Sequence, residues 1–224
     1  MQLLNEALDM KLYQNKIVLG FYFILLSITF IGCSRPVFKE KWLKQEAPSS
    51  FIARFETTKG VFDVEINRDW SPLAADRFYQ TVKHQFYNNT LFYRVVPKFV
   101  VQWGNNDTAV FKKWSPYKLA DEPVIQSNLR SYMSYARSGK ETRGSTLFIN
   151  LNDNTRLDTL VANGVKGYPP FGKVIKGMEV VDSLYAGYEG RTMRSLDTLQ
   201  KNKTLFMERF PKLDKINKAY ILRQ

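Results

Sequence analysis

The sequence predicts a mainly β protein that folds as a closed antiparallel barrel with two helices. Short stretches in which apolar and polar residues alternate recur along the chain, and such alternation is typical of strands with one buried face. Apolar residues with helical spacing interrupt these stretches at residues 72–84 and 178–184. Many short strands with few helices indicate a sheet that closes on itself.

The first expected element is a β-hairpin over residues 51–66. Its two arms carry apolar residues at every second position, on either side of a turn at Gly60: Phe51, Ala53, Phe55, Phe62, Val64 and Ile66. A helix follows, because Ser71 suits its N-cap and Pro72 its first turn. Apolar residues at every fourth position extend this helix to about His84: Ala74, Phe78 and Val82.

The later strands are expected to be short. Residues 91–103 are strongly apolar, and Pro97 and Lys98 divide them into two strands. A long polar connection over residues 105–123 comes next. Further strands are expected at residues 124–125, 132–136, 147–151 and 171–174, followed by the helix at 178–184. Helical spacing after residue 190 predicts a helical C-terminal extension.

The N-terminal segment has the pattern of an export signal. Residues 17–31 are almost entirely apolar, two lysines precede them, and Gly32 and Cys33 follow. This stretch is short for a transmembrane helix, which needs about 20 apolar residues. The residues around Cys33 resemble the bacterial lipobox, in which the cysteine is acylated and becomes the mature N-terminus. We therefore expect a lipoprotein at a membrane of the cell envelope, on its periplasmic or outer-membrane side; an uncleaved anchor with a free thiol is the alternative.

The 224 residues are enough for one ordinary domain with attachments. A lipoprotein signal peptide is expected over residues 1–32, and a tether over the polar residues 33–50. The barrel domain is expected over residues 51–190, and the helical extension over residues 191–224.

Composition excludes several kinds of chemistry. The net charge is +12, but the basic residues are scattered, so we expect no nucleic-acid partner. The single cysteine and the single histidine, His84, exclude an intramolecular disulfide, a cysteine-based zinc site and a site built from several histidines. His84 falls at the polar end of the first helix, where a solvated ring is expected. We therefore expect no metal and no cofactor.

Four motifs follow one another along the barrel domain. Residues 91–104 (LFYRVVPKFVVQWG) match the pattern F-[HY]-R-[IV]-[IV]-x-x-F-x-x-Q-x-G, and residues 133–136 (MSYA) resemble L-S-M-A. Residues 144–149 (GSTLFI) and 171–178 (FGKVIKGM) resemble G-S-Q-F-F-I and F-G-K-V-x-x-G-M. Through these motifs the chain resembles the cyclophilin-type peptidyl-prolyl cis–trans isomerases over residues 51–184. The resemblance implies eight strands, two capping helices and a groove on the outer face that binds an X-Pro segment.

The resemblance also implies roles for individual residues. Arg94 matches the catalytic arginine, and Gln102 matches the glutamine that hydrogen-bonds this arginine and the substrate backbone. The apolar proline pocket would consist of Phe99, Val100, Phe148 and Leu157. Further substrate-binding positions are Ala136, Arg137, Thr146, Arg156 and Tyr168, and the backbone near Arg137 would bind the peptide as an added strand.

The residues themselves allow a plainer interpretation. The four pocket residues would be ordinary core in many β proteins. Arg94 and Gln102 point to one face of an apolar run, where burial is costly without a partner or a function. A structural salt bridge of Arg94 remains the alternative to catalysis.

Four groove positions differ from the family's usual residues. Thr146 replaces a glutamine, Arg137 a small residue, Arg156 an aromatic residue and Tyr168 a histidine. These changes predict an altered substrate preference and weak cyclosporin binding. The leading hypothesis is an isomerase, acting as a monomer on exported proteins. A peptide-binding chaperone or assembly factor with little turnover is the alternative, and a purely structural envelope lipoprotein is a third possibility.

Overall fold

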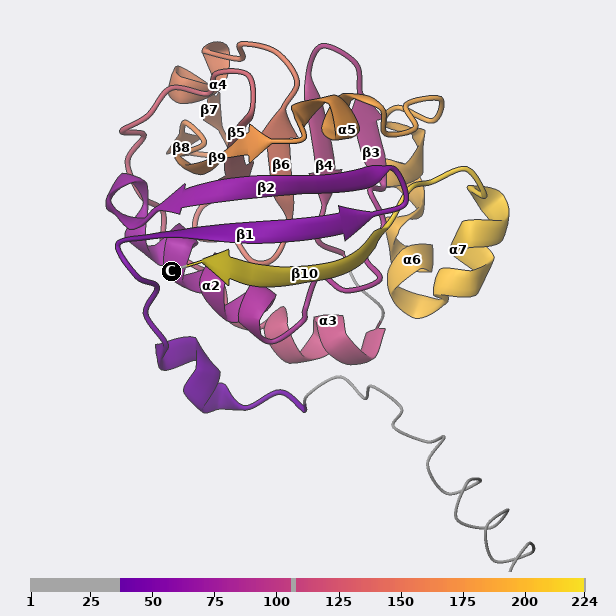
Figure 1. The fold of residues 1–224 in the computed structure, drawn as a ribbon, viewed down its shortest axis with the longest axis horizontal. Coiled ribbons are helices and arrows are strands. Elements are labelled where there is room, and N and C mark those ends of the chain that lie inside the picture. The colour runs from indigo at the N-terminus through magenta and orange to yellow at the C-terminus, as the bar shows by residue number, and fades with distance from the viewer. Residues whose placement is uncertain (1–36, 106–107, 224) are drawn as a thin grey trace, which may run out of the picture. The chain divides into compact units, whose positions relative to one another are not determined.

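The computed structural model describes residues 37–105 and 108–223, which belong to one compact unit. Eight antiparallel strands form one curled sheet in the order β10-β1-β2-β9-β5-β6-β4-β3 (Figure 1). The strands are β1 Ser50–Thr57, β2 Gly60–Asn67, β3 Arg94–Val96, β4 Val100–Trp103, β5 Tyr132–Tyr135, β6 Leu147–Asn150, β9 Pro170–Lys176 and β10 Ile216–Arg223. The mainly β fold is therefore confirmed. The predicted signal peptide and Cys33 lie outside the described residues.

The two edges of the sheet meet at one place. Leu91, just before β3, forms an isolated antiparallel bridge with Lys215, just before β10. The amide of Phe92 donates to the Asp214 carbonyl at 3.0 Å, and the amide of Ile216 donates to the Thr90 carbonyl at 2.8 Å. The curled sheet is thus joined at its edges by a short bridge, while its ladder between β10 and β3 stays incomplete.

The predicted hairpin forms as β1 and β2, whose register places Phe55 opposite Phe62. The two rings stack at a centroid distance of 4.9 Å inside the barrel. All six apolar residues that alternate along the hairpin are buried. The alternation of apolar residues along the hairpin therefore predicts correctly which side chains face the interior of the barrel.

The helices lie around the sheet. They are α2 Pro72–Lys83, α3 Thr108–Trp114, α4 Arg156–Thr159, α5 Met178–Asp182, α6 Leu196–Lys201 and α7 Lys203–Arg209, with 3-10 turns η1 Glu40–Lys44, η2 Arg68–Trp70 and η3 Arg191–Ser195. The predicted helix α2 packs its apolar face into the core. Within residues 37–105 and 108–223, no helix has the length and apolar character that crossing a membrane requires.

Two local predictions are wrong. Residues 124–125 form no strand, and the connection over residues 105–123 contains helix α3, whose Trp114 is buried. The Trp114 ring lies edge-on to Phe86 at 5.9 Å. A buried tryptophan stabilises this helix, which at seven residues is too short to be stable by itself.

The C-terminal extension is helical only in part. η3, α6 and α7 match the prediction, but β10 is a strand that pairs with β1 and supplies the eighth strand of the sheet. Register shifts interrupt the β1–β10 pairing, and the two buried residues of β10, Ile216 and Ala219, are three positions apart. That spacing is typical of a helix, so the bulges hide the strand from a periodicity argument.

The part of the predicted tether that the structure describes packs on α2 instead of extending from the domain. Trp42 of η1 is buried and stacks on His84 at a centroid distance of 3.7 Å. The Gln80 side chain donates to the Leu43 and Gln45 carbonyls at 3.1 and 2.7 Å. The ordered domain therefore begins before residue 51.

His84 is consequently partly buried, whereas the sequence predicted a solvated ring. Its Nε2 lies 2.8 Å from Oε1 of Gln45. Partial burial, assisted by the charge of Lys83, lowers the pKa of His84 to about 4. The folded protein thus favours the neutral ring at pH values where a free histidine takes up a proton.

A carboxylate from a distant segment caps α2. Ser71 occupies the N-cap position but makes no capping bond. Glu122 instead accepts from the amides of Leu73 and Ala74 at 2.8 and 3.3 Å, and the Ser71 hydroxyl also donates to it. Arg143, whose side chain is 1% exposed, donates to the same carboxylate at 2.9 Å. Glu122 therefore accepts hydrogen bonds from the first turn of α2 and also neutralises the buried charge of Arg143.

Replacing Glu122 by glutamine is expected to lower the free energy of unfolding by about 3 kcal/mol, because Arg143 then loses its buried counter-charge. Urea denaturation followed by circular dichroism measures the change. Glu179→Gln, at an exposed position in α5, is the control. A loss below about 1 kcal/mol for Glu122→Gln would contradict the assignment.

Lowering the pH from 7 to 4 is expected to remove about 1–2 kcal/mol of stability through His84, since solvent partly screens the ring. The folded-state pKa is lowered, so the loss begins below the unfolded value near 6.5 and is complete near 4. Urea denaturation at several pH values should show a shallower acid-side slope for His84→Gln than for the unmodified chain. Equal slopes would contradict the burial of the neutral ring.

Candidate active site

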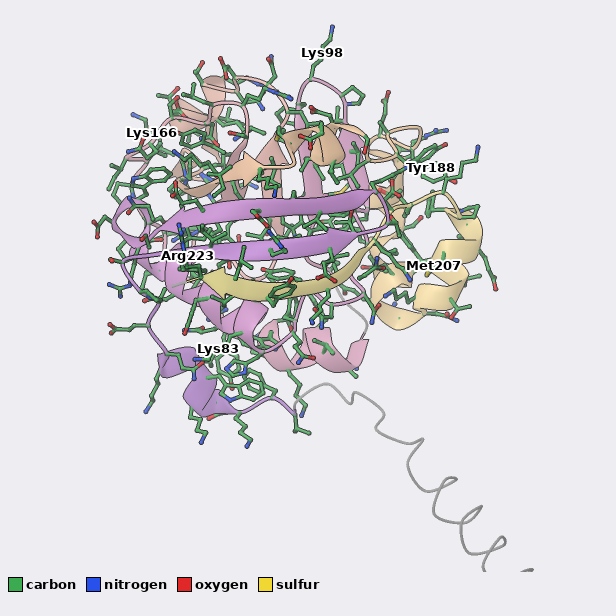
Figure 2. All side chains as sticks on the ribbon, viewed as in Figure 1. Lys83, Lys98, Lys166, Tyr188, Met207 and Arg223 are labelled. Atoms are coloured by element: carbon green, nitrogen blue, oxygen red, sulfur yellow. The ribbon has the colours of Figure 1, made fainter. Side chains whose placement is uncertain are left out.

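Arg94 and Gln102 form the polar centre of the site. They are paired residues of the β3–β4 hairpin, whose turn holds Lys98 at a φ of 61°. Nη1 of Arg94 donates to Oε1 of Gln102 at 3.0 Å. Gln102 is only 7% exposed and Arg94 is half-buried. Figure 2 shows the Lys98 side chain projecting from the tip of this hairpin.

The guanidinium of Arg94 has one unpaired hydrogen-bond donor. Its Nε is buried and has no hydrogen-bond partner among the described residues. The ion pairs that the described residues form do not include Arg94, so the salt-bridge alternative finds no support. Burial lowers the pKa of Arg94 from its usual value. A half-buried guanidinium has further N–H groups besides Nε with which it can donate to a bound molecule.

A small apolar cluster lies next to this pair. The buried side chains of Val100, Phe148 and Leu157 form it, and Phe99, Ala136 and Tyr168 pack against it partly buried. The cluster is separate from the barrel core. The structure therefore brings together the four residues predicted for the proline pocket and two of the other predicted groove positions.

Strand alternation explains the position of this cluster. Along β4, Val101 and Trp103 belong to the barrel core, whereas Val100 and Gln102 face the other side of the sheet. Phe148 is the register partner of Gln102 in β6. The outer faces of two adjacent strands thus place an amide beside an apolar surface.

Cations border the apolar cluster. The guanidinium carbons of Arg94 and Arg156 lie 5.5 and 4.9 Å from the centroid of the Phe99 ring. Arg137 lies 4.3 Å from the Tyr168 centroid. These distances are typical of cation–π contacts, which hold both rings in place.

Arg137 is more enclosed than a groove residue needs to be. Its side chain is 2% exposed, and its Nη2 donates to the carbonyls of Val165 and Gly167. Nη1 of Arg137 has no partner among the described residues.

The amide of Ala136 already donates to the Thr146 carbonyl at 2.9 Å. That amide is therefore not free to pair with an added strand.

A second pocket of about 270 Å³ adjoins Gln102. Of the predicted site residues it includes Gln102, Ala136, Arg137 and Thr146. The other lining residues are Tyr93, Asn105, Lys118, Ser138, Thr142, Met193 and Leu196.

The sequence motifs gave no signal for most of these additional residues. Lys118 comes from the long connection after β4, and Met193 and Leu196 come from the C-terminal extension. Tyr93 lies inside the first motif, directly before Arg94. This position was the one sequence feature that could have identified it as a pocket residue. Burial raises the pKa of Tyr93, whose hydroxyl lies beside Thr146 and Gln102.

Comparison with known proteins agrees with this geometry. Residues 52–205 match the family model of the cyclophilin type peptidyl-prolyl cis-trans isomerase/CLD. A peptidyl-prolyl cis-trans isomerase of Acinetobacter baylyi is 33% identical over 144 residues, which cover 63% of this chain and 76% of the relative. Peptidyl-prolyl cis-trans isomerase A of Dickeya dadantii is 37% identical over 143 residues, covering 62% of this chain and 73% of the relative.

A solved structure is similar in fold. The crystal structure of a cyclophilin type peptidyl-prolyl cis-trans isomerase from Cryptosporidium parvum superposes with a TM-score of 0.52 at 23% identity. The match covers 77% of this chain and 97% of that one. The family model spans most of the curled sheet together with the hairpin that holds Arg94 and Gln102. The chain therefore belongs to the family of cyclophilin-type peptidyl-prolyl cis–trans isomerases.

Proposed function

We propose that this protein accelerates cis–trans rotation of X-Pro bonds in exported or envelope proteins, with Arg94 as its catalytic residue. The observation that carries the proposal is the half-buried guanidinium of Arg94, which Gln102 holds beside an apolar cluster. A metal or a covalent intermediate is not needed for this reaction, because no bond is formed or broken.

The chemistry requires a donor rather than a nucleophile. Rotation about a peptide bond has a barrier of ~18–20 kcal/mol because the C–N bond has partial double-bond character. When the amide twists, the prolyl nitrogen regains a lone pair that can accept a hydrogen bond. A rigid cation that donates to this nitrogen stabilises the twisted state more than the planar one. Such a preorganised donor contributes about 3–4 kcal/mol.

Gln102 and the apolar cluster would hold the substrate for this step. Gln102 accepts from Nη1 of Arg94 at 3.0 Å, so the guanidinium is oriented before the ligand binds. The cluster around Phe148 offers an apolar surface on which a proline ring fits without losing hydrogen bonds, since proline has no amide N–H. The ring would then lie within reach of Arg94, which already contacts Phe99 of the same cluster.

Arg94→Ala is expected to lower kcat/KM about 100- to 1000-fold, because the donor to the prolyl nitrogen is lost. A protease-coupled assay on a peptide that contains one X-Pro bond measures it. Arg94→Lys keeps the charge without the planar fork and should recover only part of the rate. Arg223→Ala, at an exposed position near the end of β10, serves as the control with unchanged activity.

The same variants separate an isomerase from a peptide-binding chaperone. Equal, slow rates for the unmodified chain and for Arg94→Ala, with unchanged peptide affinity in fluorescence anisotropy, would support the chaperone and contradict the proposal. Absence of peptide binding in both proteins would instead support a purely structural role.

We further propose that an acylated Cys33 holds the protein at a membrane of the cell envelope. The proposal is supported by the apolar leader over residues 17–31 and by its resemblance to a lipoprotein signal. Two attachments stabilise membrane binding more than one chain does, and diacylation would supply both.

Cys33→Ser is expected to prevent acylation and to release the protein from the membrane fraction. Metabolic labelling with a radioactive fatty acid, followed by fractionation, measures both effects. Membrane attachment that persists in the variant together with an uncleaved leader would contradict acylation and support the transmembrane anchor.

A further inference from the structure

Three elements at one end of the domain carry a group of exposed lysines. The lysines belong to η1 and its N-cap, to α3 and to the last turn of α2: Lys39, Lys41, Lys44, Lys83, Lys112 and Lys113. All of these side chains are exposed, and we call the group the basic face. Figure 2 shows Lys83 at the end of the domain opposite to Lys98.

Aromatic contacts hold the elements of the basic face together. The Phe38 ring, just before η1, lies 5.0 Å from the Trp114 ring of α3 and 5.7 Å from the Tyr117 ring. Trp42 of η1 stacks on His84, which directly follows α2. The lysines therefore belong to one packed surface, although distant parts of the sequence supply them.

The positive charge of the basic face is largely uncompensated. The one acidic residue in the sequences of η1 and α3 is Glu40, which accepts from the Tyr117 hydroxyl at 2.8 Å. Glu46, just after η1, lies 3.6 Å from Arg68. Within the described part of the chain, no ion pair includes a lysine of the basic face. Such an excess of one charge attracts an anionic partner.

The length of the tether decides which anionic surface lies within reach. Cys33, the proposed acylation site, precedes Phe38 by only five residues, and such a stretch spans at most about 18 Å. A folded domain of this size is about 40 Å across. Because Phe38 packs on α3, the anchor holds this end of the domain close to the bilayer.

We propose that the basic face docks on the anionic phospholipid headgroups of the bilayer that holds the anchor. The inference rests on the proposed attachment through Cys33. Lysines close to an anionic bilayer are attracted to it, over a range of about 8 Å at physiological ionic strength. The anchor keeps the domain at a high effective concentration beside the headgroups, so that weak attraction is sufficient.

Docking in this way would orient the active site. Figure 1 shows α3 and the indigo turn η1 at one end of the domain, and α4 and the turn between β3 and β4 at the other. Phe99, at that turn, and Leu157 of α4 belong to the apolar cluster. This end would then lie farthest from the lipids, where segments of exported proteins can reach it.

Acetylation of lysines with a neutral amine-reactive reagent measures the docking residue by residue. The full-length gene product is purified from the membrane fraction in detergent. It is then reconstituted into vesicles of phosphatidylcholine, either alone or with about one third phosphatidylglycerol. Mass spectrometry of the digested protein gives the rate at which each lysine is labelled.

On the anionic vesicles, Lys41 and Lys112 are expected to react at least about threefold more slowly than on the neutral ones, because headgroups cover them. Lys98 and Lys166, which Figure 2 shows away from the basic face, should react at the same rate on both. Salt at about 1 M should abolish the difference, since it screens the attraction.

A fourfold variant separates docking from mere proximity to the anchor. It removes charge from η1, its N-cap and α3 through Lys39→Gln, Lys41→Gln, Lys112→Gln and Lys113→Gln. The remaining Lys44 and Lys83 should then react equally on both kinds of vesicle. The matched control removes the same charge from exposed lysines outside the basic face through Lys59→Gln, Lys98→Gln, Lys166→Gln and Lys176→Gln. It should keep the slow reaction of Lys44 and Lys83.

The outcomes distinguish docking from anchoring. Equal labelling of the basic face on both kinds of vesicle, in protein attached to them, overturns docking and leaves acylation of Cys33 in place. Slower labelling of Lys98 and Lys166 instead would mean that another face meets the lipids, which also overturns it. An uncleaved leader leaves the test unchanged, because the tether has the same length. If the protein carries no acyl group and does not attach to vesicles, the proposed anchor fails and docking fails with it.

Discussion

The alternation of side chains along β4 is the constraint on which the rest of the site depends. Val101 and Trp103 fill the barrel core, so Val100 and Gln102 must face the opposite side. Because one buried strand fixes both faces, a register slip by one residue would exchange core and site residues. The Trp103 ring, packed edge-on to Phe55 at 5.9 Å, makes such a slip costly. The packing of Val101 and Trp103 in the core therefore determines which side chains of β4 face the site.

The site itself carries energetic costs that the surrounding structure offsets. The buried Nε of Arg94 lacks a partner, and an unpaired buried donor costs about 1–3 kcal/mol. The β3–β4 ladder, the bond from Thr192 to the Tyr93 carbonyl and the Phe99 ring hold the guanidinium in this position. A guanidinium that is already oriented loses little freedom on meeting its acceptor, as the proposed stabilisation of a twisted amide requires.

The sequence predicts those parts of the protein that depend on local pattern. The hairpin and α2 follow from periodicity, and the strands around Arg94 follow from an apolar run. Phe99, Val100 and Phe148 of the apolar cluster lie in the motifs over residues 91–104 and 144–149. Three features escape prediction because distant contacts create them. Glu122 caps a helix that begins about fifty residues earlier. Trp42 is held by stacking on His84, which lies about forty residues later in the chain. Bulges in the β1–β10 pairing give the buried residues of β10 the spacing of a helix.

The same reasoning explains why the helical part of the C-terminal extension, residues 191–209, was not predicted to line the pocket beside Gln102. Its apolar residues read as an ordinary amphipathic helix, and nothing in their spacing identifies Leu91 and Tyr93 as partners. Both ends of the segment are nevertheless held: α5 packs beside β2, and β10 pairs with β1. A segment held at both ends and bonded to the backbone at Tyr93 has little conformational freedom. The extension therefore forms a fixed side of the pocket beside Gln102.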